Sequence, residues 1–379
     1  MRPARSAWAH RYDMARFLPS RSVGWPARIL WPLLVLSILA TDPLAEDRVT
    51  SRVDIYTDDD ATTIVSPLLI LQKDVFNETS LTVQYLADIE SCASVDVVST
   101  ASPSGGYKET RHDISAVVSY RRHLTTVGGG YGYSTENDYT SNYVLVNLSQ
   151  ELLERNLKLD FALACRWDEI SRVKDETFSK RLNGLNTSFS LTQTLSPRML
   201  GQFVYFLEYL DGYQSSPYRV VPVADFSVPE THPNRRIRQS ITGRLKEAIT
   251  DRWFAEQSLR YYFDSWGLKS GTLLLQFYHQ FSNPVTVRLR YRFYVQGRAS
   301  FYREYYESLQ EFVSRDRTLA TLQTHLVGPQ ISLQVEDFWV FSEAIFDVKA
   351  EYFFINYEDF ALLDYRQGVL IGMGMDLWY

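Results

Sequence analysis

The chain has 379 residues, a formal net charge of −6 and 45% hydrophobic residues. The excess of acids argues against a nucleic-acid partner, which requires a basic surface. The mean hydropathy is slightly negative, which excludes a bundle of membrane-spanning helices because such helices are almost wholly apolar. Aromatic residues reach 14%, and Tyr and Trp suit a boundary between hydrocarbon and water. A membrane β-barrel fits these values, since only alternate residues of its strands need be apolar.

The first 45 residues have the pattern of an export leader. Arg21 and Arg28 precede the apolar run 29–40, which is too short to span a bilayer. We predict a signal peptide over 1–45, cleaved after Ala45, with Met14 as an alternative start. An uncleaved membrane anchor is the other interpretation of this run. No later stretch is apolar enough for a membrane helix, so residues 46–379 would have to enter a membrane as strands.

Beyond residue 46, hydrophobic residues alternate with polar ones, which is the pattern of strands with one apolar face. In 285–296, Leu289 and Phe293 fall on one face, and Arg288 and Arg292 fall on the other. Many of these segments reach about ten to fourteen residues, which exceeds a usual soluble strand and suffices to cross a bilayer. In chain order we predict strands at 49–57, 62–74, 79–89, 111–121, 124–134, 139–150, 156–167, 182–194, 198–210, 235–248, 252–264, 271–282, 285–297, 320–336, 343–357 and 366–379.

The predicted strands number about sixteen, an even count as bacterial single-chain barrels require. Gly328 and Pro329 should interrupt pairing, so fourteen or eighteen strands stay open. Connections alternate in length, as expected for short periplasmic turns and long outer loops. The short ones are 75–78, 122–123, 151–155, 195–197, 249–251 and 283–284, and the long ones are 90–110, 168–181, 211–234 and 298–319. We therefore predict an all-β, antiparallel transmembrane barrel over 46–379, embedded in outer-membrane lipid.

The last strand ends in an aromatic residue. Apolar residues occupy alternate positions up to the chain end, at Val369, Ile371, Met373, Met375, Leu377 and Tyr379. This pattern resembles the signal read by the barrel-insertion machinery, although Phe is commoner than Tyr at the final position. An ordinary edge strand is the alternative. We take Ile371, Met373, Met375, Leu377 and Tyr379 as the candidate insertion signal.

Six collinear stretches resemble an uncharacterised family (a domain of unknown function) of large bacterial outer-membrane β-barrels. They are SVDVVSTASP at 94–103, VSYRR at 118–122, GYGYSTENDY at 130–139, PYRVVP at 217–222, THPNRR at 231–236 and RYYFDSWGLKS at 260–270. Together they span most of residues 46–379. The resemblance implies the fold and the outer-membrane location, and it implies no substrate or catalytic residue.

The inward faces of the predicted strands are rich in charge. The candidate lumen-lining bases are Arg236, Arg238, Arg244, Arg260, Arg288, Arg290 and Arg292, with Lys246 beside them, and the acids are Asp160, Glu256, Asp347 and Glu351. A barrel of about sixteen strands is too wide to be filled by its own side chains. The bases then either favour anions along a passage for small polar solutes or pair with the acids and only build the wall. A closed or surface-binding barrel acting through its outer loops is the alternative function.

A membrane-embedded hydrolase is the third hypothesis. Outer-membrane lipases resemble one another in placing a His and a Ser two residues apart on a lipid-facing strand. Here His279 is followed by Gln280 and Phe281, and Ser282 falls on the opposite face. No Gly-x-Ser-x-Gly pattern occurs either. We interpret His279 as a rim residue near the membrane interface and predict no enzyme.

No metal ion or cofactor is predicted. The run 58–60 is three Asp residues in a tight outer turn, but it lacks the Gly and distal Glu of a calcium loop, so we expect a solvated turn. His232 has no second ligand at metal spacing. Glycines 128–130 and 132 sit within a strand, where they would relieve crowding. Cys92 and Cys165 are expected to be independent thiols, because Cys165 falls on an outward face. No pattern indicates an oligomeric state.

Overall fold

The computed structural model describes residues 47–379 except 93, 95–106 and 174; the predicted leader 1–45 lies outside the described residues. Sixteen antiparallel strands form a closed barrel, sealed by pairing of β1 with β18. The barrel strands are β1 (Arg48–Asp58), β2 (Thr62–Phe76), β3 (Thr79–Cys92), β4 (Tyr107–Arg122), β5 (Thr125–Thr135), β6 (Tyr139–Leu152), β7 (Leu157–Arg172), β8 (Asp175–Ser196), β9 (Met199–Gly212), β12 (Arg235–Ala248), β13 (Trp253–Asp264), β14 (Lys269–Gln280), β15 (Val285–Gln296), β16 (Leu322–Phe338), β17 (Phe341–Tyr357) and β18 (Tyr365–Trp378). In the described part of the chain, no helix is long and apolar enough to cross a membrane.

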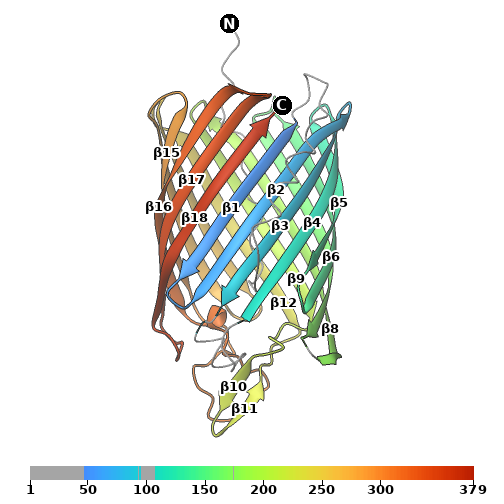
Figure 1. Ribbon diagram of the computed structural model, residues 1–379, viewed down its shortest axis with the longest axis vertical. Helices are drawn as coiled ribbons and strands as arrows, with labels where there is room; N and C mark the ends of the chain where they lie inside the picture. Colours follow the sequence, from blue (N-terminus) through green and yellow to red (C-terminus); the bar gives the residue numbers. More distant parts are fainter. Residues whose placement is uncertain (1–46, 93, 95–106, 174) are drawn as a thin grey trace.

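The predicted barrel and its sixteen strands are confirmed. Short turns and the C-terminus lie at one end of the barrel, and the long connections lie at the other (Figure 1). In an outer-membrane barrel the first end is periplasmic and the second faces outward. Outside the barrel, β10 (Val220–Val223) and β11 (Phe226–Pro229) form a separate hairpin, and η2 (Arg317–Leu319) is a short 3-10 helix.

Two local predictions differ from the structure. Residues 168–181 were expected to form a loop, but β7 and β8 continue pairing to Arg172 and Asp175 across a bulge, so that hairpin extends beyond the barrel wall. Gly328 and Pro329 interrupt pairing on one side only. Both stay in register with β15, whereas the ladder to β17 skips them. A proline lacks one backbone donor, so it disturbs one neighbour and spares the other.

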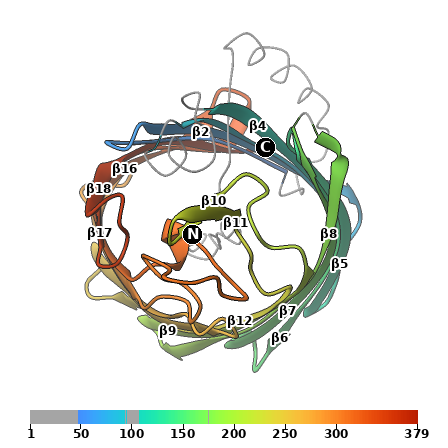
Figure 2. The same cartoon turned by 90° about the horizontal axis from the view of Figure 1, so that it is seen from below.

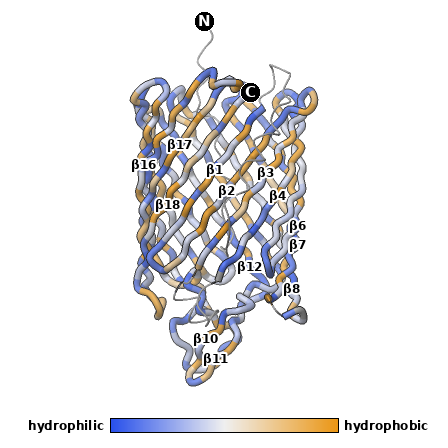
Figure 3. The backbone as a smooth tube through the Cα atoms, viewed as in Figure 1, coloured by the Kyte–Doolittle hydropathy of each residue, from blue (hydrophilic) through white to orange (hydrophobic). Residues whose placement is uncertain are grey.

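The barrel has an apolar outer face and a polar inner face. Leu259, Leu289 and Val348, on three different strands, are 65%, 52% and 54% exposed. Such exposure over the whole wall is stable only in lipid. The alternation is visible as orange and blue segments along each strand (Figure 3). Cys165 lies on the outer face, and both described cysteines are free thiols, as predicted.

Five polar residues on the outer face lie near the outward end, and each meets a tyrosine hydroxyl from the neighbouring strand. Without such partners, a buried polar group at the edge of the hydrocarbon would cost free energy. The pairs are Tyr85 with His112, Tyr131 with Asn142, Tyr205 with Gln239, Tyr291 with His325 and Tyr352 with Gln367. Because these pairs occur around the barrel, they mark the outward boundary of the membrane-spanning belt.

Candidate functional site: the charged interior and the outer cap

Four adjacent strands form a basic wall inside the barrel. The registers of β12 to β15 place side chains of one parity on the inner face. The only acids among them are Glu256 and Asp264, both on β13. The bases are Arg236, Arg238, Arg244, Lys246, Arg260, Arg288, Arg290 and Arg292. This basic wall therefore carries a large local excess of positive charge, although the chain as a whole is acidic.

Most of these cations have carboxylate partners. Arg244 and Lys246 share Glu256, at 3.3 and 3.1 Å. Arg288 and Arg290 share Glu351, at 3.2 and 3.3 Å. Two bases on one carboxylate leave a net positive charge at each pair.

The two remaining β12 arginines have one partner each. Arg238 meets Glu208 of β9 at 2.8 Å, and Arg236 pairs with Asp264. Ion pairs therefore account for part of this wall, as the salt-bridged interpretation expects. They leave a surplus of positive charge.

Arg292 differs from its neighbours on β15. Its guanidinium lies 5.5 Å from the centre of the Tyr294 ring, and no carboxylate within ion-pair distance of it is found among the described residues. Arg290 and Arg260 are its charged neighbours. Arg260, two strands away on β13, lies near Tyr262 and Tyr294. These arginines and tyrosines lie together within the basic wall.

The other predicted acids lie elsewhere. Asp347 accepts hydrogen bonds from Gln330 at 3.0 Å and pairs with Arg52 of β1 at 3.3 Å. Asp160 pairs with Lys158 of its own strand at 2.8 Å. Asp347 also lies close enough to Arg288 of the basic wall to interact with it electrostatically. Sequence reasoning missed Arg52, because its partner Asp347 lies 295 positions away and meets it only when the barrel closes.

Acids are also concentrated across the barrel from the basic wall. The strand order places β3 and β4 opposite β13 and β14. Their inner faces carry Asp88, Glu90, Glu109 and Asp113 around Arg111, which lies 3.8 Å from Asp113 and 3.9 Å from Asp88. Carboxylate atoms of Glu109, Glu136 and Asp138 lie within 4.8 Å of one another. Opposite walls of the interior thus carry opposite charge.

The candidate insertion residues all belong to β18 and its end. Ile371 and Met373 are 42% and 53% exposed on the outer face, and Leu377 is buried between Val49 and Ala344 of the adjacent strands. Met375 has the same parity. The Tyr379 ring lies 4.8 Å from the Phe341 ring. The structure places Ile371 and Met373 toward lipid, and recognition of the row by an insertion machinery stays a prediction.

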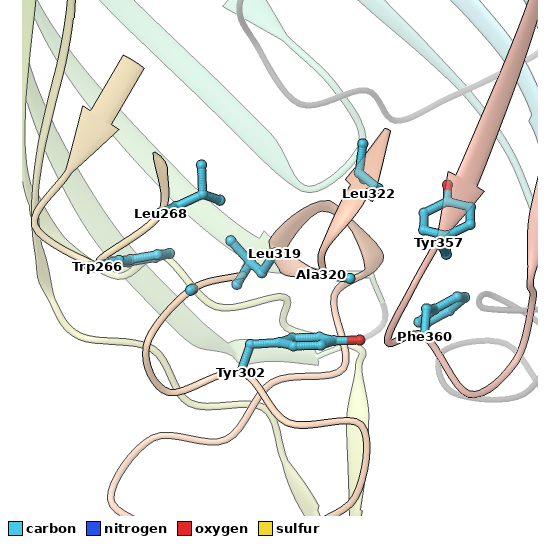
Figure 4. Packing of buried hydrophobic residues seen from close by; sticks show 9 residues of the cluster. Trp266, Leu268, Tyr302, Leu319, Ala320, Leu322, Tyr357 and Phe360 are labelled. Atoms are coloured by element: carbon cyan, nitrogen blue, oxygen red, sulfur yellow. The ribbon is translucent and has the colours of Figure 1, made fainter. Parts of the chain in front are cut away.

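Two long connections form a cap across the outer opening. Residues 213–234, which include β10 and β11, and residues 297–321 cross the mouth of the barrel (Figure 2). The second segment packs on the barrel end through an apolar cluster (Figure 4). The cluster consists of Trp266, Leu268, Ala299, Tyr302, Leu319, Ala320, Leu322, Tyr357 and Phe360. Burying large apolar side chains at a barrel mouth fixes the cap in place.

Each half of the cap is also tied to the rim. In the first segment, the Arg172 guanidinium donates to the Pro217 carbonyl at 2.7 Å, and the Tyr218 hydroxyl donates to Asp138. In the second, Arg317 pairs with Asp60 of the β1–β2 turn. The prediction of a solvated turn at 58–60 is therefore wrong for Asp58 and Asp60, because Arg366 and Arg317, distant in sequence, cover their carboxylates.

A buried polar network joins the two halves, and sequence reasoning missed it. Ser314 is 0% exposed and donates to Glu230 at 2.7 Å, while His232 Nε2 lies 3.0 Å from its hydroxyl. Arg219 bridges Glu230 and Asp316, each at 3.2 Å. These residues come from two segments about eighty positions apart, so no spacing in the sequence predicts their contact. We name this network the cap junction.

The serine–histidine contact does not have the geometry of a nucleophile and its base. The carboxylate of Glu230 approaches the same nitrogen of His232, at 3.4 Å, whereas Nδ1 faces a backbone carbonyl. In a catalytic triad the acid orients the base from the opposite nitrogen. Ser314 is also closed to any substrate. His279, the other candidate, lies between the rings of Trp253 and Phe281 at 4.2 and 4.3 Å, in the rim position predicted for it.

A closed barrel with a lipid-facing apolar surface and a charged interior defines a β-barrel protein of the bacterial outer membrane. The model of the family described as protein of unknown function (DUF3570) matches residues 77–374, and the chain belongs to this family. No curated protein matches the chain.

Several solved structures are similar to the chain. A bacterial polysaccharide outer membrane secretin has 9% identity and a TM-score of 0.48, covering 90% of this chain and 100% of the other. OmpT of Vibrio cholerae has 8% identity and a TM-score of 0.48, with 90% and 99% covered. The siderophore receptor PirA from Pseudomonas aeruginosa has 10% identity and a TM-score of 0.40, with 89% and 81% covered. Identities this low say nothing about function.

Proposed function

We propose that the protein is a non-enzymatic passage for small polar solutes, in which the basic wall favours anions. The observation that carries this proposal is the uneven charge of the interior. The bases of β12 to β15 outnumber their carboxylate partners, and a group of four acids lies on β3 and β4 across the barrel. Fixed charges that line a water-filled channel with low-dielectric walls set which ions enter it.

The charge arrangement also suggests how a solute would be oriented. A solute that carries both an anionic and a cationic end would turn the first toward the basic wall and the second toward Asp88 and Asp113. Arg292 is the residue we expect to contribute most to anion preference, because no described carboxylate neutralises it. Arg288 and Arg290 contribute less, since each is held by Glu351.

Single-channel conductance in a planar bilayer, with a salt gradient to obtain the reversal potential, tests this proposal. We expect discrete current steps with anion preference. Arg292→Gln should lower the anion-to-cation permeability ratio by about twofold or more, because it removes a charge from the wall. Arg121→Gln is the matched control: this base lies near the periplasmic end, is 56% exposed and has its own partner, Glu151. Heat-dependent gel mobility verifies folding.

A folded barrel that conducts no current, or one that prefers cations, would contradict the passage. The silent result would favour a closed or surface-binding barrel acting through its outer loops. The specific observation behind that second function is the cap, whose packed core crosses the opening. Lipid hydrolysis by the folded protein that is lost in His279→Ala would instead favour the hydrolase.

A further inference from the structure

The cap junction is the place where the two halves of the cap meet over the opening. Away from it, residues 213–234 are tied to the β5–β8 side of the rim through Asp138 and Arg172. Residues 297–321 are tied to the opposite side through Asp60 and through Asp359, whose carbonyl accepts from the Tyr302 hydroxyl at 3.0 Å. Separating the halves at the junction would leave both anchorages intact.

The hydrogen bonds of the junction specify the protonation state of His232. Nδ1 lies 3.0 Å from the carbonyl oxygen of Gln214, and a carbonyl only accepts, so Nδ1 carries a proton. The single hydroxyl proton of Ser314 is donated to Glu230, and its oxygen also accepts from the backbone N–H of Asp316 at 3.1 Å. The contact of 3.0 Å between Nε2 and this oxygen then requires a proton on Nε2 as well. The geometry is that of an imidazolium.

The charges around His232 match this state. Glu230 and Asp316 supply two negative charges, and Arg219 with the imidazolium supplies two positive ones. Trp266 and Phe301 pack on the ring at 5.1 and 5.5 Å, and the Arg236 guanidinium lies over the Trp266 ring. The Tyr306 hydroxyl lies within hydrogen-bond distance of the carbonyls of Phe301, at 2.9 Å, and of Ser314, at 3.2 Å.

The other ionisable groups around His232 have shifted pKa values. Burial opposes ionisation of Glu230, but Arg219 and His232 outweigh it and lower its pKa to about 2. Burial likewise opposes ionisation of Asp316, and Arg219 with the Thr318 amide lowers that pKa below its usual range. Burial raises the pKa of Tyr306 above its ordinary value. The carboxylates of Glu230 and Asp316 and the hydroxyl of Tyr306 therefore keep one protonation state between pH 5 and pH 8.

We propose that His232 is a pH-dependent latch that joins the two cap segments in its protonated form and releases them when it loses a proton. A neutral ring can only accept at Nε2, so it must take the hydroxyl proton of Ser314 away from Glu230. The junction then loses one charge-assisted hydrogen bond and its charge balance. The consequence for solute entry rests on the proposed passage, whereas the opening of the cap does not.

Deuterium exchange of the folded protein at several pH values, corrected for intrinsic exchange rates, tests the latch. The reporters are the amides of Thr231 and Val313, each bonded to the other residue's carbonyl at 3.0 Å across the junction. We expect their protection to fall about tenfold from pH 5 to pH 8, the factor expected for one hydrogen bond to a charged group. His232→Gln should give a low protection that no longer varies with pH. His279→Gln, at the periplasmic rim, should behave like the unmodified protein.

Two results would overturn the latch: equal protection at pH 5 and pH 8 in the unmodified protein, or an unchanged pH dependence in His232→Gln. If His232→Gln does not fold, Glu230→Gln provides the same test, because it removes the carboxylate that the imidazolium requires. Deuterium exchange can be measured whether or not the barrel conducts ions. Conductance measurements on the same samples separate the two proposals. A barrel that conducts no current but has a pH-dependent cap would contradict only the proposed passage.

Discussion

Glycines on the inner face of β5 make room for long side chains of β6. A Cβ at Gly132 would overlap the Tyr143 ring, and one at Gly128 would overlap the Asn147 side chain. Tyr143 thereby lies flat against the wall and reaches Asp113, to which its hydroxyl donates at 3.0 Å. The interpretation of these glycines as relieving crowding agrees with this packing. The sequence could not name the side chains that need the space, because they depend on strand register.

Gly132→Ala should therefore destabilise the barrel. The added methyl group displaces the Tyr143 ring and strains its bond to Asp113, which we expect to cost about 1–3 kcal/mol of unfolding free energy. Urea unfolding in lipid vesicles measures this change. Gly243→Ala is the control, since nothing lies within 4 Å of its Cβ position. That variant should be neutral or gain roughly 0.5 kcal/mol, and an equal loss in both would contradict the packing argument.

Asp376 holds the closing seam of the barrel from the inside. It is 0% exposed and accepts from Thr50 and Arg48, both at 2.6 Å, and from Arg52 at 2.9 Å. Asp376→Ala leaves two arginines without this carboxylate, so we expect a loss of about 3 kcal/mol. Asp160→Ala, which removes a carboxylate that is 31% exposed, should stay within about 0.5 kcal/mol. Similar unfolding midpoints for the two variants would contradict this assignment.

Partners of individual charges were the least predictable feature. Alternation shows which face of a strand a residue occupies, and the bases of β12 to β15 could be assigned to one side on that ground. It does not show that Arg52 meets Asp347, because the two lie 295 positions apart and their contact depends on closure of the barrel. The pairing of Arg288 and Arg290 with Glu351 depends in the same way on the register across β16.

At the scale of elements, strands were predictable and outer connections were not. The predicted strand at 285–297 matches Val285–Gln296 almost completely, because lipid on one side and water on the other impose period two. Residues 168–181 lie outside this environment, so they pair in β7 and β8 without an alternation of apolar and polar residues in the sequence. The β10–β11 hairpin is stabilised by the other cap segment, because Val221 and Val223 pack on Tyr306 and Val313. Tertiary contacts of this kind leave no pattern in the local sequence.

The last strand carries a testable element-level prediction. If its outward row is an insertion signal, Tyr379→Ala should slow assembly several-fold in vesicles that contain the insertion machinery and have little effect in pure lipid vesicles. Trp378→Ala is the control: it removes the adjacent aromatic, which lies on the inner face with Arg48 5.0 Å from its ring centre. The folded fraction is followed by heat-dependent gel mobility. Equal slowing with and without the machinery would identify Tyr379 as an ordinary packing residue.

At the scale of the whole molecule, the wall and the cap depend on pH in different ways. The wall is an antiparallel ladder closed on itself, and its ion pairs are distributed over many strands. The two cap segments are joined by the cap junction, in which the carboxylates of Glu230 and Asp316, both with lowered pKa, face Arg219 and His232, and by the apolar contacts of Val221 and Val223 with Tyr306 and Val313. Acid should therefore open the cap before it unfolds the barrel.

The sign of this effect follows from the lowered pKa of Glu230. A group whose folded pKa lies below its ordinary value stabilises the folded state fully above the ordinary value, 4.5, and loses that contribution as pH falls toward about 2. Combined with the latch, protection of Thr231 and Val313 should be greatest near pH 5, decline gradually toward pH 8 and decline steeply below pH 4. Strand amides of β15 should stay protected throughout. Loss of cap and strand protection together in acid would show that the cap has no separate stability and would contradict the division between wall and cap.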